Sequence, residues 1–159
     1  MSRVKETSAQ DEAVYDLTAQ SLAPGAKSLL ILEDDPDFSE MLRLFLEDNS
    51  FKVTCVANGV DGLRQVMNND FDVIVCDLVM PNLPGDMFYR AVERTKKRLC
   101  KRFVFITGHK SDPKWHEFLS KIGGPVLEKP FKMADLVSTI QTLLTENALQ
   151  SPDGDSPAK

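Results

Sequence analysis

Short, mainly apolar runs alternate with segments of helical periodicity through the middle of this 159-residue sequence. Each run is read as a strand, and the first and third are typical of strands that are buried on both faces of a sheet. The runs cover residues 28–32, 51–56, 71–76, 102–107 and 125–128. Between and after them, apolar residues recur at the spacing of an amphipathic helix. This alternation predicts an α/β fold, in which right-handed crossovers build a parallel sheet covered by helices on both faces.

The length suits one domain, and we expect that domain to occupy residues 28–145. Residues 1–27 are polar with a weak apolar stripe, and Pro24-Gly25 breaks the chain before the first strand. We therefore predict a weakly helical or disordered N-terminal extension over 1–27. Residues 151–159 contain no large apolar side chain that could repay the entropy of ordering. We expect a disordered C-terminal tail over residues 146–159.

Composition and charge exclude several classes of function. The net charge of −5 and the pI of about 5.0 disfavour direct binding to nucleic acid. No apolar run approaches the roughly 18 residues that a membrane span needs, and the N-terminus lacks the apolar core of a secretory signal. The three cysteines, Cys55, Cys76 and Cys100, are odd in number and form no C-x-x-C motif. We expect reduced thiols, a cytoplasmic location and no membrane insertion.

Polar residues that can carry chemistry follow the apolar runs, where each predicted strand ends. They are Glu33-Asp34-Asp35 after the first run, Asp77 after the third, Thr107 in the fourth and Lys129 after the fifth. In parallel sheets, sites lie outside the carboxyl ends of the strands. Clustered carboxylates raise one another's pKa, and a divalent cation relieves their repulsion. The sequence therefore predicts a site for Mg²⁺, which prefers oxygen ligands.

Each of these residues also has an ordinary structural explanation. Asp35 or Asp37 can cap a helix that begins near Pro36. Threonine is common at the end of a strand, and a lone lysine is usually solvated. Their coincidence on successive strands of one predicted sheet favours a shared functional site.

The sequence resembles the receiver domain of two-component response regulators over about residues 28–145. The resemblance is carried by Leu29-Leu30-Ile31-Leu32-Glu33-Asp34-Asp35, Asp77-Leu78-Val79-Met80-Pro81-Asn82-Leu83-Pro84-Gly85, Phe105-Ile106-Thr107-Gly108 and Glu128-Lys129-Pro130-Phe131. It implies a doubly wound (βα)5 flavodoxin-like fold with strand order 2-1-3-4-5. Both a stand-alone receiver and the receiver of a hybrid histidine kinase are consistent with these motifs.

The resemblance also implies roles for the acidic residues. Asp77 corresponds to the phosphoacceptor. Asp34 corresponds to the acid that binds Mg²⁺ directly, together with Asp77 and the backbone carbonyl of Val79. Glu33 corresponds to the other member of the acidic pair, which acts through a metal-bound water. Because three acids are adjacent, Asp35 is an alternative member of this pair.

The resemblance implies two further site residues and a class of partner. Thr107 corresponds to the hydroxyl that hydrogen-bonds a phosphoryl oxygen, and Lys129 to the ammonium that contacts the phosphoryl group. The phosphoryl donor is expected to be a phosphohistidine of a sensor histidine kinase or a phosphotransfer protein, and the output an altered contact with a downstream protein. Such a domain assists its own phosphorylation and dephosphorylation and is not otherwise an enzyme.

The sequence departs from the receiver pattern at Val126, three residues before Lys129. Receivers usually carry Tyr or Phe there, and this ring reorients on phosphorylation. We interpret Val126 as a core residue, and a receiver-like binding module that works without phosphorylation remains the alternative. A phosphohydrolase of the haloacid dehalogenase type is disfavoured because Val79 occupies the place of its general-acid aspartate.

Overall fold

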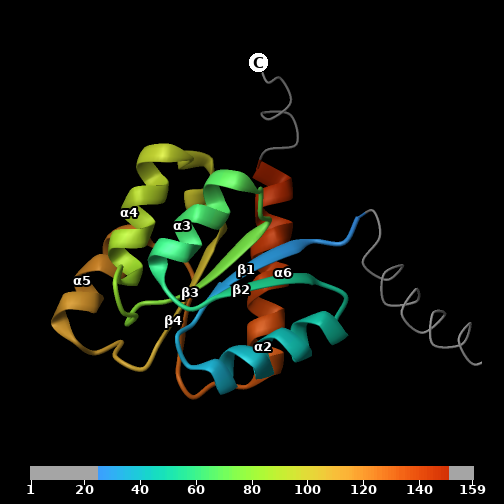
Figure 1. The fold of residues 1–159 in the computed structure, drawn as a ribbon, viewed down its shortest axis with the longest axis horizontal. Coiled ribbons are helices and arrows are strands. Elements are labelled where there is room, and N and C mark those ends of the chain that lie inside the picture. The colour runs from blue at the N-terminus through green and yellow to red at the C-terminus, as the bar shows by residue number, and fades with distance from the viewer. Residues whose placement is uncertain (1–24, 151–159) are drawn as a thin grey trace, which may run out of the picture.

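A single parallel sheet of five strands organises the computed structural model, which describes residues 25–150 (Figure 1). The strand order is β2-β1-β3-β4-β5, so the predicted fold class and order are confirmed. The strands are β1 (Ser28–Leu32), β2 (Lys52–Val56), β3 (Val73–Asp77), β4 (Phe103–Thr107) and β5 (Val126–Glu128). The helices are α2 (Pro36–Asp48), α3 (Gly59–Asn68), α4 (Gly85–Thr95), the 3-10 helix η1 (Lys97–Arg102), α5 (Pro113–Ile122) and α6 (Met133–Gln150).

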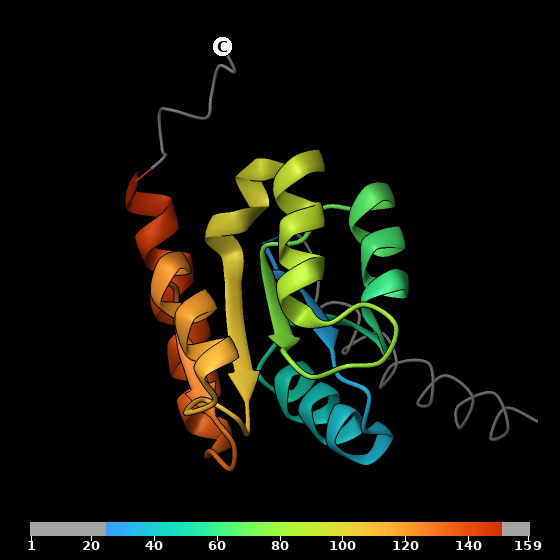
Figure 2. The ribbon, with the colours of Figure 1, turned by 90° about the vertical axis from the view of Figure 1, so that its left-hand side faces the viewer.

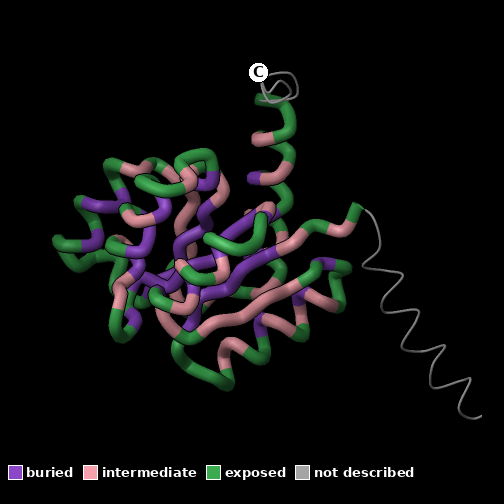
Figure 3. Tube along the Cα trace, turned by 45° about the horizontal axis from the view of Figure 1, so that its top comes forward, coloured by how far each residue is buried: buried purple, intermediate pink, exposed green. Residues whose placement is uncertain are grey.

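Helices cover both faces of the sheet, because strand residues alternate between two apolar cores. Leu30 and Phe105 belong to the core under α3, α4 and α5. Leu29 and Ile106 belong to the core under α2 and α6. Figure 1 shows this layering, and Figure 2 looks onto the molecule from the side of α4 and α5. All five residues of β3 and of β4 are buried, as the apolar runs predict (Figure 3).

Side-chain caps fix where three of the helices begin. The Asp35 carboxylate accepts hydrogen bonds from the backbone N–H groups of Asp37 and Phe38 at the start of α2. Asn58 caps α3, and Asp112 caps α5. Of the two candidate caps for α2, the structure therefore selects Asp35.

A close backbone approach fixes the loop between β3 and α4. A Cβ atom added to Gly85 would lie 2.7 Å from the carbonyl oxygen of Asp77 and 2.8 Å from the Cα of Leu78. The Gly85 N–H donates to the Leu78 carbonyl at 2.9 Å. Glycine is required here because any side chain would push the start of α4 away from the end of β3.

Two features of the chain were not anticipated from the sequence. The basic stretch after α4 forms η1, with Leu99 fully buried in the core. Helix α6 runs to Gln150, so residues 146–150, which were expected to be disordered, are helical. The helix continues because Leu143 is buried and the Asn147 amide donates to the Lys101 carbonyl of η1 at 3.1 Å. Expectations for 1–24 and 151–159 concern residues outside the described range.

Trp115, the only tryptophan of the sequence, belongs to the core under α5. Its exposed fraction is 6%. The ammonium of Lys114 lies 4.5 Å from the centroid of its ring. The side chain therefore packs inside the fold, with one cation against it.

Candidate functional site

Three charged side chains meet at the carboxyl edge of the sheet. The Lys129 Nζ donates to Asp77 Oδ2 at 2.8 Å and to Glu33 Oε1 at 3.0 Å. Glu33 follows β1, Asp77 ends β3 and Lys129 follows β5. The Lys129 backbone N–H donates to the Thr107 carbonyl at 2.8 Å, which extends the pairing of β4 with β5 and directs the lysine toward the centre of the edge.

Burial makes this cluster electrostatically unusual. The side chains of Glu33 and Asp77 are 1% and 6% exposed, and that of Lys129 is 28% exposed. Burial is the main reason that the pKa of Glu33 is raised to about 7; the Asp77 charge also acts to raise it, and the Asp35 backbone N–H and Lys129 act to lower it. Burial also disfavours the charged form of Lys129, but its bonds to Asp77 and Glu33 outweigh this and raise its pKa. The ammonium therefore stays charged between two buried acids.

The carboxylates of Glu33, Asp34 and Asp77 provide a set of oxygen ligands for a divalent cation. One oxygen from each lies within 4.8 Å of the others. Asp34 is exposed, which leaves room for water on a metal ion. Mg²⁺ prefers such a set, because it binds one or two carboxylates and keeps several waters. The donor set therefore fits Mg²⁺.

Asp35 lies outside this set of carboxylates. Its Oδ1 accepts the N–H groups of Asp37 at 3.0 Å and Phe38 at 3.4 Å, and its own N–H donates to Glu33 Oε2 at 3.0 Å. The geometry therefore supports Glu33 and Asp34 as the acidic pair. Val79, the expected carbonyl ligand, donates its N–H to Asp77 Oδ1 at 3.1 Å.

Thr107 is fully buried at the end of β4, next to Ile106, which is the sheet partner of Asp77. Its hydroxyl accepts the backbone N–H of His109 at 2.9 Å. The structure thus places Thr107 on the strand beside Asp77, with its oxygen engaged by the following loop.

The structure also reveals aromatic neighbours of Lys129. The Lys129 Nζ lies 4.9 Å from the centroid of the Phe38 ring, and Phe131 meets that ring edge-on at 5.9 Å. A groove of about 500 Å³ adjoins them, lined by Asp35, Phe38, Met41, Lys129, Pro130, Phe131 and Met133. The only sequence signal for Phe38 is an apolar residue in the first helical turn after the acidic run.

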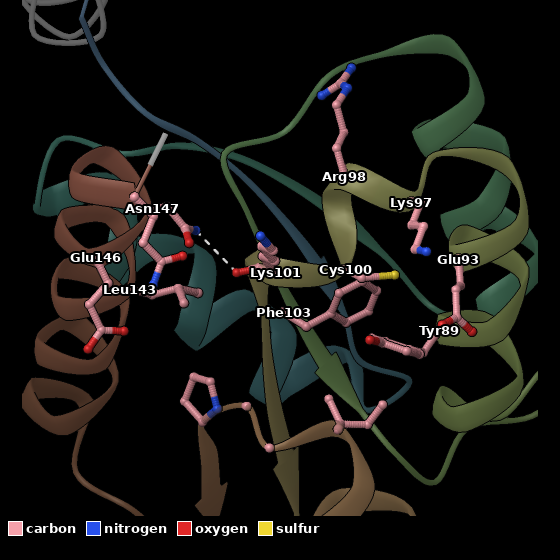
Figure 4. Close-up of a pocket in the computed structure, with 15 residues that line it drawn as sticks. Tyr89, Glu93, Lys97, Arg98, Cys100, Lys101, Phe103, Leu143, Glu146 and Asn147 are labelled. Atoms are coloured by element: carbon pink, nitrogen blue, oxygen red, sulfur yellow. Dashed lines mark hydrogen bonds between the residues drawn. The ribbon is translucent and has the colours of Figure 1, made fainter. Parts of the chain in front are cut away.

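A larger cavity of about 690 Å³ lies at the opposite, amino edge of the sheet (Figure 4). Tyr89 and Phe103 form part of its wall, Lys97 lies beside Glu93 of α4, and Lys101 lies on the side nearer α6. The charged residues of this wall are exposed, so the cavity holds no buried ionic cluster like that of Lys129. The chemistry of the described residues is therefore concentrated at the carboxyl edge.

Comparisons with known proteins agree with this geometry. The family model of the response regulator receiver domain matches residues 29–141. The response regulator SaeR of Staphylococcus aureus (strain USA300) is 28% identical over 117 residues, which are 74% of this chain and 50% of SaeR. The chain thus spans about half the length of the curated relatives that it matches.

Solved receiver domains share the fold. A CheY-like receiver domain protein from Methanospirillum hungatei JF-1 superposes with a TM-score of 0.74 at 21% identity, over 80% of this chain and all of that chain. The signal receiver domain of a histidine kinase from Syntrophus aciditrophicus gives 0.69 at 28% identity, over 76% and 92% of the two chains. The receiver domain of the sensor kinase PA1611 from Pseudomonas aeruginosa PAO1, which holds magnesium in its active-site cleft, gives 0.69 at 24%, over 76% and 99%.

Among residues 25–150, no helix is both long and apolar enough to cross a membrane.

Proposed function

Because this chain belongs to the response regulator receiver domain family of two-component signalling, we propose that Asp77 is its phosphoacceptor. The donor is a phosphohistidine of a sensor histidine kinase or a phosphotransfer protein. The observation that carries this proposal is the buried contact of Lys129 with Asp77 at 2.8 Å. It marks Asp77 as the carboxylate beside which a cation can neutralise an incoming phosphoryl group.

Phosphoryl transfer to Asp77 forms one bond and breaks one. A carboxylate oxygen of Asp77 bonds to phosphorus, the phosphorus–nitrogen bond breaks, and the electron pair of that bond stays on the donor imidazole. Lys129 stabilises the negative charge of the transferring group, because its ammonium already lies against Asp77. Positioning and charge neutralisation are the main contributions that a protein makes to such a reaction.

Glu33, Asp34 and Asp77, with the Val79 carbonyl, would hold the Mg²⁺ ion. When bound, the ion supplies positive charge that offsets both the acidic cluster and the phosphoryl oxygens. Asp34 and Asp77 would be direct ligands, and Glu33 would act through a metal-bound water. Magnesium in the active-site cleft of the PA1611 receiver supports this assignment.

The output of the domain would begin at Thr107. We expect its hydroxyl to leave the His109 N–H and donate to a phosphoryl oxygen, which moves the loop between β4 and α5. Since Val126 provides no aromatic ring beside this strand, the rearrangement would pass through the loop and α5 to a downstream protein. We expect the reaction to take place in the cytoplasm and without direct binding to nucleic acid.

Intact-protein mass spectrometry after incubation with Mg²⁺ and acetyl phosphate tests the proposal. The wild type should gain one phosphoryl group, and the gain should disappear in Asp77→Asn and after addition of a chelator. Asp35→Asn is the matched control, because asparagine also caps a helix. If neither acetyl phosphate nor a promiscuous histidine kinase labels the wild type, the chain is instead a binding module that works without phosphorylation.

A further inference from the structure

The Lys129 ammonium has an aromatic neighbour as well as its two acidic partners. Hydrogen bonds to Asp77 and Glu33 occupy two of its directions. The Phe38 ring, with its centroid 4.9 Å from Nζ, covers a third side. We propose that Phe38 is a positioning residue, whose ring face holds the Lys129 ammonium against Asp77. The proposal rests on the function proposed above for Asp77.

The distance from Nζ to the ring suits a cation–π interaction. The negative face of an aromatic ring attracts an ammonium within about 6 Å of its centroid, and the attraction strengthens when the cation is shielded from water. Lys129 is mostly shielded, with 28% of its side chain exposed. A flexible lysine has many rotamers, so a contact that restricts Nζ favours the geometry in which it touches Asp77.

Two contacts position Phe38, one through its ring and one through its backbone. Phe131 packs edge-on against it, with the planes at 70°, a preferred geometry for aromatic pairs. The Asp35 carboxylate accepts the Phe38 backbone N–H and so fixes the first turn of α2. Asp35 also donates its own N–H to Glu33 Oε2 at 3.0 Å. One short segment thus joins the acid, the cap and the ring that surround the ammonium.

The ring and the lysine share a groove. Phe38 and Lys129 both line that groove of about 500 Å³. Leucine at position 38 would keep an apolar side chain in α2 but would remove the negative ring face. The Lys129 ammonium would then be freer to turn toward water and less often placed for phosphoryl transfer.

Phosphorylation rates with acetyl phosphate and saturating Mg²⁺ provide the first test. We expect Phe38→Leu to slow labelling of Asp77 by three- to tenfold, and Phe38→Tyr, which keeps the ring, to stay within twofold of wild type. Phe45→Leu is the matched control, because it makes the same change two helical turns further along α2. Phenylalanine analogues with one, two and three ring fluorines at position 38 should lower the rate stepwise, since fluorine weakens the ring's negative face at nearly constant shape.

Proton exchange of the Lys129 ammonium with water, measured by NMR on the unphosphorylated protein, provides the second test. The exchange should be at least fivefold faster in Phe38→Leu and unchanged in Phe45→Leu. This readout distinguishes two failures. If the wild type takes up no phosphoryl group, the function proposed for Asp77 fails while the exchange rates still decide the role of Phe38. Wild-type labelling by Phe38→Leu, a flat fluorine series or unchanged exchange would each overturn the proposal.

Discussion

The ion pairs at the two edges of the sheet differ in burial. At the carboxyl edge, the Lys129–Glu33 pair is 3.0 Å long, with side chains 28% and 1% exposed. At the amino edge, the Arg98–Asp70 pair is also 3.0 Å long, but its side chains are 55% and 60% exposed. Water screens the second pair and leaves it nearly neutral for stability. Equal distances therefore describe unequal interactions, and burial separates them.

Burial also explains why charge density alone is a poor guide to the site. The stretch from Arg94 to Arg102 is strongly basic, yet most of its cations are exposed at the end of α4 and on η1, and the half-buried Arg102 donates to the Phe71 carbonyl. The carboxyl edge has fewer charges. Because Glu33 and Asp77 are buried at the ends of β1 and β3, their charges must be satisfied by the neighbouring Lys129.

The largest contrast should come from removing one lysine at each edge. Lys129→Met leaves Glu33 and Asp77 buried without their cation, and we expect a loss of about 2–3 kcal/mol of unfolding free energy, moderated because Glu33 can take up a proton. Lys101→Met at the amino edge should cost less than about 0.5 kcal/mol. Urea unfolding without Mg²⁺ measures both changes. Equal losses would contradict the contrast between the edges.

Two glycines, Gly85 at the carboxyl edge and Gly124 near the amino edge, allow the packing of the two edges to be compared. Gly85→Ala would force a methyl group against the Asp77 carbonyl and should cost about 2 kcal/mol of stability. Gly124→Ala, near the amino edge, meets its nearest neighbours only at 3.8 Å and should be close to neutral. Thermal unfolding of the two variants provides the measurement. A harmless Gly85→Ala would mean that the β3–α4 loop moves freely away from β3.

The pKa of Glu33 predicts a pH dependence for the carboxyl edge. Burial raises this pKa from 4.5 to about 7 in the folded protein, so the stability from this group is complete below about pH 4.5 and is lost as pH rises through 7. Mg²⁺ requires the ionised acid, so its dissociation constant should fall about tenfold between pH 6 and pH 8. Calorimetric titration at each pH measures this. Glu33→Gln should flatten the pH profile, and an unchanged slope in that variant would assign the proton to another group.

The smallest expected changes in stability come from alanine variants of the two neighbouring acids Asp34 and Asp35, and they distinguish the roles of these residues. Asp35→Ala removes the cap of α2 and should cost about 1 kcal/mol of stability, with Mg²⁺ affinity within about threefold of wild type. Asp34→Ala should leave α2 intact and weaken Mg²⁺ binding by more than tenfold, as expected for loss of a direct ligand. Unfolding and titration of both variants separate the roles. A reversed pattern would move the metal ligand to Asp35.

The sequence predicted the architecture well because its strands are buried on both faces. Runs such as 73–76 contain only apolar residues and end in an acid, which indicates both the strand and its functional edge. The assembly of Asp77 with Lys129 followed from the rule that parallel strands end together. The sequence left the roles of Asp34 and Asp35 open, because it does not show which way two adjacent acidic side chains point. In the structure, the Asp35 carboxylate caps α2, whereas the Asp34 carboxylate lies near those of Glu33 and Asp77.

Features that depend on contacts distant in sequence escaped prediction. Helix α6 continues past residue 145 because Asn147 meets η1, which lies about 46 residues earlier in the chain. The 3-10 helix itself forms around the buried Leu99, within a stretch of basic residues. The contact of Phe38 with Lys129 likewise joins α2 to the residue after β5. Periodicity within one segment contains no information on such partners.

Trp115 gives the protein an intrinsic fluorophore at the start of α5. It is the sole tryptophan, so the whole indole emission comes from the helix that follows the Thr107 loop. The ammonium 4.5 Å from its ring centroid adds a local electric field to that emission. Displacement of Lys114 relative to the ring would shift the emission wavelength of Trp115, and exposure of the indole would broaden its emission band. The fold thus contains an optical probe of the β4–α5 region that needs no label.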